Sequence, residues 1–305
     1  MTIRPLTVWL CVLGFQAVAA AQSPQNPSPM VEHVREHPRL TKSEPAGKRK
    51  NLTLGKLFVP RAVEQAPTTE PVPLVISFHC GDWIPELACS GLTSPLPCVT
   101  IGLGAGSERY ARPFRDDPEL FAKLRDEAAK EIGRPISKLI LVGWSAGYGA
   151  IREALKNEAL SRDIQAVILL DGLHTGYVGG KPGPKESSLE TDPMQPFLAY
   201  ARRAVAGQCK FVYLHSEIFP GTFASTTETA DWLIRELGLR RVPVLKWGPM
   251  KTQMLGETEA GGLKIQAFAG NSAPDHVDLL HALPDVLRET LKLESSHDVK
   301  RTTDR

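Results

Sequence analysis

Short runs of aliphatic and β-branched residues recur along the chain and are separated by segments with a different periodicity. Each run is too short for a helix of ordinary length and is bounded by Gly, Pro, Asp or His, so it predicts a strand buried on both faces. The strands predicted in this way are 74–78, 99–101, 139–142, 165–170, 210–214 and 263–268.

Between these runs, apolar residues recur three or four positions apart, which is typical of helices packed on a sheet. The predicted helices start at 116–119 and end near 132, cover 146–160, run from a capping box at 225–228 to 237, and cover 277–291 with a kink or break at Pro284. Strands that alternate with helices predict an α/β fold, with a mostly parallel central sheet and helices on both faces.

The segment 175–193 is rich in Gly and Pro and is predicted to be a loop. It follows the carboxyl end of the strand at 165–170. Open α/β sheets bind their ligands outside the carboxyl ends of the strands, so this loop is a candidate wall of a binding site.

Both ends of the chain differ from its middle. Residues 1–21 have an early Arg4, an apolar run and three small residues at 19–21, which predicts a cleaved signal peptide and a secreted or periplasmic protein. The apolar run is shorter than the roughly 20 residues of a membrane-spanning helix, so we expect no membrane association after cleavage. Residues 22–50 are predicted to be a flexible arm, 51–294 the folded domain, and 295–305 a disordered tail.

The composition of the chain limits the classes of binding partner that we expect. The 305 residues are 42% hydrophobic and 23% charged, with a net charge of +2, which gives no electrostatic reason to expect nucleic acid. Export implies an oxidising compartment, where Cys80, Cys89, Cys98 and Cys209 allow three pairings. Cys89 and Cys98 are the best candidates for a disulfide, and buried free thiols are the alternative.

The strand at 139–142 is followed by Gly143-Trp144-Ser145-Ala146-Gly147 and then by a predicted helix. A serine in such a strand-to-helix turn is held in a strained conformation that exposes its hydroxyl, and the flanking glycines avoid clashes. The N–H groups at the start of the helix can meet developing negative charge. A glycine-flanked packing turn is the alternative for Ser145.

With this motif, with His79-Cys80-Gly81 after the strand at 74–78, and with a late histidine, the chain resembles the α/β-hydrolase superfamily, in the style of secreted esterases and depolymerases. The resemblance extends over residues 51–293, approximately. It implies that the predicted folded domain, residues 51–294, is the catalytic domain. It implies the chain order of nucleophile, acid and histidine.

Five histidines follow Ser145, and His276 is the predicted base because a short loop places it after the last strand and ahead of the final helix. His174 is the main alternative, since it is adjacent to the candidate acid. His281 is expected to pack within the helix, His215 to lie in the core, and His297 to be solvated in the tail.

Asp171 ends the strand at 165–170 and is the predicted acid, because a carboxylate there can orient the base. Glu217, after the following strand, is the alternative and occupies the more usual superfamily position. Asp275 is too close in sequence to orient His276, and a carboxylate that caps the turn at Gly172 is the structural alternative for Asp171.

The predicted oxyanion donors are the backbone N–H of Ala146 and that of Cys80 or Gly81. Cysteine replaces the glycine usual in the superfamily's His-Gly loop, which leaves the second donor open. His79 is expected to support the loop rather than react.

Other chemistry has little support. The glycines at 102–106 are misplaced for a dinucleotide loop, and His276 with Asp278 is a weak metal signal, so no cofactor and no metal are expected. The predicted protein is a serine hydrolase that cleaves small-molecule or polymeric carboxylic esters through an acyl-enzyme on Ser145. A peptidase on the same fold and a non-catalytic binding protein are the alternatives.

Overall fold

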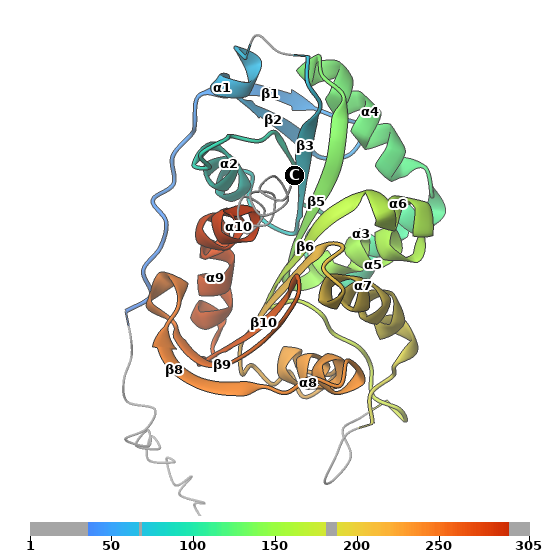
Figure 1. The fold of residues 1–305 in the computed structure, drawn as a ribbon, viewed down its shortest axis with the longest axis vertical. Coiled ribbons are helices and arrows are strands. Elements are labelled where there is room, and N and C mark those ends of the chain that lie inside the picture. The colour runs from blue at the N-terminus through green and yellow to red at the C-terminus, as the bar shows by residue number, and fades with distance from the viewer. Residues whose placement is uncertain (1–35, 67–68, 181–187, 293–305) are drawn as a thin grey trace, which may run out of the picture. The chain divides into compact units, whose positions relative to one another are not determined.

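A computed structural model of the protein describes residues 36–66, 69–180 and 188–292, and a ten-stranded sheet runs through them (Figure 1). The predicted signal peptide, arm residues 22–35 and the tail lie outside the described residues. Within the described part of the chain, the structure has no helix of the length and apolarity required to cross a bilayer.

The sheet is mixed, with a parallel centre and antiparallel edges. Its order is β1-β2-β4-β3-β5-β6-β7-β10-β9-β8, and the six strands from β4 to β10 in this order are parallel. The bounds are β1 Gly47–Asn51, β2 Lys56–Pro60, β3 Val72–Phe78, β4 Cys98–Ile101, β5 Ile136–Trp144, β6 Ile164–Leu170, β7 Lys210–His215, β8 Val242–Trp247, β9 Gln253–Ala260 and β10 Leu263–Phe268.

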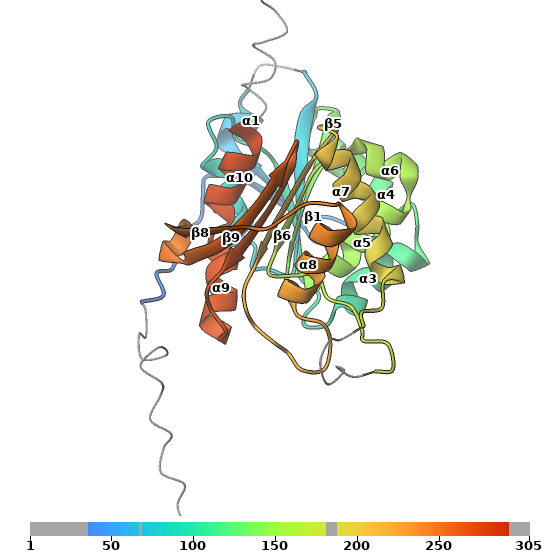
Figure 2. The same ribbon diagram turned by 60° about the horizontal axis from the view of Figure 1, so that its bottom comes forward.

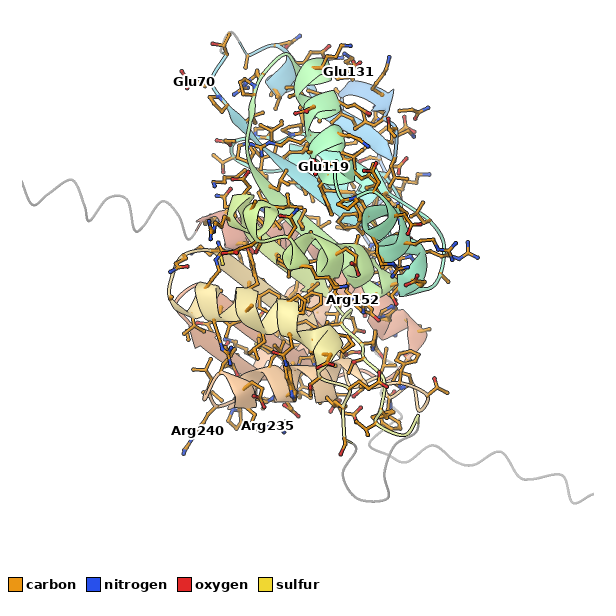
Figure 3. The ribbon with its side chains drawn as sticks, turned by 90° about the vertical axis from the view of Figure 1, so that its right-hand side faces the viewer. Glu70, Glu119, Glu131, Arg152, Arg235 and Arg240 are labelled. Atoms are coloured by element: carbon orange, nitrogen blue, oxygen red, sulfur yellow. The ribbon has the colours of Figure 1, made fainter. Side chains whose placement is uncertain are left out.

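Helices cover both faces of the sheet (Figures 1 and 2). On one face lie α2 (Trp83–Ser90), α9 (Ala273–His281) and α10 (Leu283–Lys292). On the other lie α3 (Ser107–Asp116), α4 (Leu120–Ile132), α5 (Tyr148–Lys156), α6 (Glu158–Asp163), α7 (Gln195–Val205) and α8 (Thr226–Glu236), while the short α1 (Arg61–Glu64) follows β2. Figure 3 shows the second face, where Glu119 and Glu131 mark the two ends of α4.

The predicted fold class is confirmed, and all six predicted strands form the parallel centre of the sheet. These strands are buried on both faces, which is why their apolar runs are continuous in the sequence. The antiparallel edge strands β1, β2, β8 and β9 were not predicted. In β8 and β9 exposed or half-buried positions interrupt the apolar signal.

The predicted helices are present with different limits. The helix expected over 146–160 is divided into α5 and α6 at Asn157, whose side chain caps α6. The capping box at Ser225 and Glu228 opens α8 as predicted. The last helical region begins earlier than predicted and breaks between α9 and α10, next to Pro284. Helices α2, α3 and α7 were not predicted.

The predicted arm is wrong for residues 47–50, because they belong to β1. The Arg49 guanidinium bonds the buried carboxylate of Glu86 on α2, with Nη2 2.5 Å from Oε2, and lies over the ring of Phe58. A buried carboxylate needs such a partner. This ion pair ties β1 into the fold.

The cysteines contradict the predicted disulfide. Cys80, Cys89, Cys98 and Cys209 are all free thiols. Cys89 on α2 and Cys98 on β4 are neighbours, and their hydrogen bond together with burial raises the pKa of Cys98 well above its usual value. The two sulfurs therefore meet as thiols and not as a covalent bridge.

The last residue of β7, His215, is buried and neutral. Its Nε2 accepts a hydrogen bond from Arg241 at 2.9 Å, while Nδ1 faces the carbonyl oxygen of Ser216 at 3.3 Å. Burial, and then the charge of Arg241, lower the pKa of His215 to about 4. The expectation that His215 is a core residue is confirmed.

His215 predicts acid sensitivity of the fold. In the unfolded chain its pKa is near 6.5, so between about pH 6.5 and pH 4 the unfolded state binds a proton that the folded state excludes. The stability present above pH 6.5 should be lost by roughly 3 kcal/mol on acidification to pH 4. Urea unfolding from pH 8 to pH 4 should show a shallower decline for His215→Gln than for the wild type. Equal slopes would contradict a neutral buried His215.

Candidate active site

Ser145 occupies a strained turn between β5 and α5. Its φ is 47°, in the left-handed region that non-glycine residues rarely adopt, and it opens a short 3₁₀ turn, Ser145–Gly147. A Cβ on Gly147 would lie 2.6 Å from the carbonyl oxygen of Phe78, and one on Gly172 would lie 2.3 Å from that of Ser145. Gly147 lets β3 approach the turn, as the motif predicts. Gly172 lies outside the motif and lets the loop after β6 approach Ser145.

The hydroxyl-bearing residue is accessible. Ser145 is half-buried and lines two cavities, of about 560 Å³ and 320 Å³. His174 and Phe223 line both cavities as well, so they lie between them. A molecule bound in either cavity would therefore lie next to Ser145.

Asp171 is a buried carboxylate surrounded by donors. It follows β6 with a φ of 45°. Its Oδ1 accepts from the backbone N–H of Ser216 at 2.9 Å and from the Thr226 hydroxyl at 2.8 Å, and its Oδ2 accepts from the Ser216 hydroxyl at 2.7 Å. The remaining bond joins Oδ2 to Nδ1 of His276 at 2.7 Å. Asp171 and His276 are therefore in direct contact, as the predicted roles require.

The electrostatics of Asp171 favour the ionised form. Burial alone would raise its pKa, but the hydrogen bond and charge of His276 and the bonds from Ser216 outweigh that effect and hold the pKa below its usual value. The carboxylate is thus an acceptor at neutral pH and fixes the imidazole by its Nδ1.

His276 lies in the first turn of α9, where it is the fourth residue, and not in the loop predicted ahead of the helix. The start of α9 is fixed by a capping box in which Ser272 and Asp275 exchange hydrogen bonds. Asp275 is thereby engaged with the cap. About a quarter of the His276 side chain is exposed, and it lines the 320 Å³ cavity together with Ser145. No hydrogen bond joins Ser145 and His276 among the described residues.

The alternative candidates for the acid and the base make other contacts. Glu217 is exposed, and its backbone N–H donates to Gly270; its carboxylate makes no bond to His276 within the described chain. His174 donates from Nδ1 to the carbonyl oxygen of Ala224 at 2.8 Å, and burial lowers its pKa. His281 packs edge-on against Trp83, and its Nδ1 accepts from the Leu40 N–H. His297 lies outside the described residues.

Trp144, the residue before Ser145, contacts His276, and no sequence pattern predicts this contact. The two rings are 4.7 Å apart, and Trp144 Nε1 donates to the backbone oxygen of His276 at 3.0 Å. The indole also stacks on the ring of His79, with the two ring centroids 5.1 Å apart. The imidazole is thus fixed by Asp171 at one nitrogen and by Trp144 along its ring.

The predicted oxyanion residues lie in two parts of the structure, the turn after β5 and the loop after β3. Ala146 lines the larger cavity beside Ser145. Cys80 and Gly81 follow β3, close to the turn, but neither is among the described residues that line the two cavities. His79, with a φ of 66°, bonds the Tyr110 hydroxyl at 2.8 Å, and that hydroxyl also accepts from the N–H of Leu103. His79 therefore supports this loop, as expected.

A metal site has weak support. Among the described residues, one group of three side chains brings ligand atoms within 4.8 Å of one another: His37, Asp275 and Asp278. Arg39 forms an ion pair with Asp278 at this group, and His37 Nδ1 lies 2.8 Å from Asp278 Oδ2. The carboxylate of Asp278 at this group is thus paired with the guanidinium of Arg39.

Comparisons with known proteins gave matches only among solved structures; no family model and no curated protein matches. The chain is similar to a thermostable carboxylesterase cloned from a metagenomic library (11% identity over 83% of this chain and 91% of that one, TM-score 0.49). It is also similar to a ferulic acid esterase (15%, 76% and 91%, TM-score 0.47) and to carboxyl esterase 2 from the fungus Tuber melanosporum (14%, 88% and 94%, TM-score 0.45).

The fold of this chain is assigned from its own topology and not from its similarity to these distant structures. A mostly parallel sheet is covered on both faces, Ser145 follows β5 in a sharp strand-to-helix turn, and Asp171 and then His276 follow in chain order and meet at the same sheet edge. The described part of this chain has the α/β-hydrolase fold.

Proposed function

We propose that this protein is a serine hydrolase that cleaves carboxylic esters through an acyl-enzyme on Ser145. The observation that carries the proposal is the 2.7 Å bond between Asp171 and His276, formed beside a serine in a strained turn that opens on the same cavity as His276. A buried carboxylate, an oriented imidazole and an accessible hydroxyl are the parts that nucleophilic acyl transfer requires.

His276 acts as the general base. Its Nδ1–H donates to Asp171, which leaves Nε2 free to accept the proton of the Ser145 hydroxyl. The serine oxygen attacks the ester carbonyl, and a tetrahedral oxyanion forms. The open distance between Ser145 and His276 closes with substrate bound, as is common for catalytic hydrogen bonds in unliganded sites.

Collapse of this intermediate releases the alcohol. The proton held on His276 passes to the leaving oxygen, the carbon–oxygen bond breaks, and the acyl group remains on Ser145. Water then attacks the acyl carbon while His276 again takes a proton as base. The bond between the acyl carbon and the Ser145 oxygen breaks, His276 returns the proton to that oxygen, and the acid product leaves. Asp171 keeps its charge throughout and stabilises the imidazolium that forms in each step.

The oxyanion is held by backbone N–H groups. Ala146 follows the nucleophile in the 3₁₀ turn and lines the larger cavity, which makes its N–H the first donor. The second donor comes from Cys80 or Gly81 in the loop after β3, which the close approach of Phe78 to Gly147 brings next to Ser145. The protein acts after export, directed by the signal peptide at residues 1–21.

Ser145→Ala should abolish hydrolysis of p-nitrophenyl esters while the circular dichroism spectrum stays that of the wild type, because the acyl-enzyme cannot form. A fluorophosphonate probe should label the wild type at Ser145 and leave the variant unlabelled. Unchanged turnover in Ser145→Ala would reject the mechanism. A wild type that neither labels nor turns over would favour a binding protein, and faster cleavage of peptides than of esters would favour a peptidase.

Asp171→Asn should lower kcat by about 10³- to 10⁴-fold with little change in KM, because the amide cannot hold the required tautomer or stabilise the imidazolium. The matched control is Glu217→Gln, the same change at the exposed alternative acid, which should keep kcat within about twofold of the wild type. Steady-state kinetics on one ester separate the two variants. A large loss in Glu217→Gln with a mild one in Asp171→Asn would exchange their roles.

Trp144→Phe keeps a ring beside His276 but removes the donor to its backbone oxygen. Its kcat should fall about fivefold, the rate equivalent of one hydrogen bond of about 1 kcal/mol. Trp144→Leu removes the stacked ring as well and should lose more. If both variants keep wild-type kcat at every pH from 5 to 9, Trp144 does not position the imidazole.

A further inference from the structure

We propose that the larger cavity binds the acyl half of the substrate and that Arg152 recognises a carboxylate at the far end of that acyl group. The preferred substrates would then be monoesters of dicarboxylic acids. This inference rests on the proposed function, since it assigns the two sides of the ester to the two cavities that meet at Ser145.

The role of His276 decides which cavity holds the alcohol and which holds the acyl group. The leaving oxygen must lie close to the imidazole that protonates it, so the alcohol occupies the 320 Å³ cavity lined by His276, Ile218 and Pro220. The acyl chain then extends the other way. The cavity on that side is about 560 Å³ and contains Ala146, whose N–H faces the carbonyl oxygen in the mechanism above.

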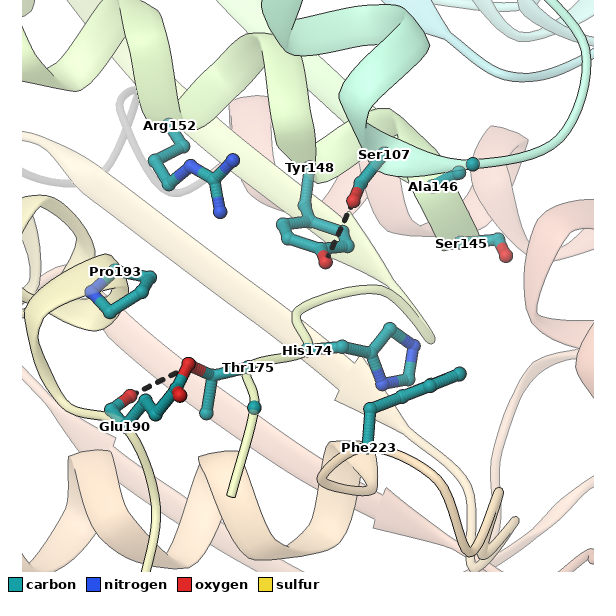
Figure 4. Close-up of a pocket in the computed structure, with 12 residues that line it drawn as sticks. Ser107, Ser145, Ala146, Tyr148, Arg152, His174, Thr175, Glu190, Pro193 and Phe223 are labelled. Carbon is teal, nitrogen blue, oxygen red and sulfur yellow. Dashed lines mark hydrogen bonds between the residues drawn. The ribbon is translucent and has the colours of Figure 1, made fainter. Parts of the chain in front are cut away.

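The wall of the larger cavity is aromatic and uncharged near Ser145 and carries a positive charge farther from it. Near the serine lie Tyr148, His174 and Phe223, whose rings suit a hydrocarbon chain (Figure 4). Burial lowers the pKa of His174, so this part of the wall carries no charge at neutral pH. Farther along α5, the guanidinium of Arg152 points toward the cavity (Figure 4).

Arg152 is poised for an anionic ligand. Its side chain is 17% exposed, and it makes no hydrogen bond to any described residue. The contacts it has are an ion pair of 3.6 Å from Nε to Glu153, which also bonds Lys156, and the ring face of Tyr148 at 5.9 Å. The two terminal nitrogens are left to meet a planar anion in the paired geometry that guanidinium and carboxylate adopt.

The spacing selects the length of the acyl group. Arg152 is seven residues after Ser145, which is roughly 10 Å along the helix, and helical side chains lean back toward the N-terminus. A carboxylate separated from the ester carbonyl by several methylene groups spans this interval. A short acyl group, such as acetyl, does not reach Arg152.

Other charges near the cavity limit where the anion can lie. Glu190 lies across the cavity from Arg152, on the side of Thr175, and is exposed (Figure 4). Glu108 is engaged by Arg115, whose hydrogen bond lowers the pKa of that carboxyl. The acyl carboxylate is therefore placed against the α5 wall and away from Glu190.

The test compares two pairs of esters, and the members of each pair differ in the charge of the distal group. The substrates are the mono-p-nitrophenyl esters of adipic and suberic acid and the same esters with the distal carboxylate replaced by a primary carboxamide. The wild type should show a kcat/KM about tenfold or more higher for the carboxylate ester, the worth of one charge-assisted pair of hydrogen bonds. Arg152→Met should remove this preference, which is read as the ratio of kcat/KM for the carboxylate ester to kcat/KM for the carboxamide ester of the same variant.

Two further variants separate the local contact from general electrostatics. Arg235→Met removes the same charge from an exposed arginine on α8 that does not line the cavity, and it should keep the wild-type preference (Figure 3). Arg152→Lys should retain part of the preference, since it keeps the charge without the planar fork.

The outcomes distinguish the two proposals. Equal rates of the wild type on both esters, or a preference that survives in Arg152→Met, would overturn the role of Arg152 and leave the esterase intact. A preference lost equally in Arg235→Met would make it a long-range effect and would also overturn the proposal. No turnover of either ester, together with no fluorophosphonate labelling of Ser145, would instead reject the serine hydrolase.

Discussion

The site depends on the burial of one carboxylate. Asp171 is 2% exposed, and a charge so deeply buried is strongly destabilising unless donors surround it. The donors come from segments far apart in the sequence: Ser216 after β7, Thr226 at the start of α8 and His276 in α9. Satisfying one side chain therefore holds the ends of two strands and the starts of two helices together. The same contact that stabilises this edge of the sheet orients the imidazole, so stability and the proposed chemistry share one interaction.

How much the sequence predicts follows from how each element is buried. The parallel strands are enclosed on both faces, so their apolar runs are continuous and were identified, as was the turn at Ser145 from its glycines. The edge strands have mixed patterns, and β1 belongs to the fold through the Arg49–Glu86 ion pair, which no periodicity reveals. Helix α9 begins earlier than its apolar residues suggest because Ser272 and Asp275 cap it. That cap moves His276 from a loop into a helix.

The candidate site was predictable where a residue follows a strand and not where it depends on a side-chain contact. The sequence predicts Asp171 because it ends a strand, where a carboxylate can face the base, and His276 because a short loop places it between the last strand and the final helix. The contact of Trp144 with the His276 backbone could not be derived, since it depends on the direction of an indole on a different element. Arg152 carries no motif at all. It becomes a candidate only because the cavity brings an arginine without hydrogen-bond partners among the described residues beside aromatic rings and Ser145.

Residues ahead of the sheet also bear on the position of the imidazole. His37 and Arg39 contact Asp278, and Leu40 donates to His281, so the segment 37–40 is attached to the same helix that carries His276. Asp278 is fully buried and needs a charged partner, which Arg39 supplies. The start of α9 is thus held by its own capping box, by Trp144 and by a segment more than two hundred residues earlier in the chain. Because the helix is held in this way and Asp171 and Trp144 contact the ring itself, the imidazole has little freedom to lose when a substrate binds, as the proposed proton transfer requires.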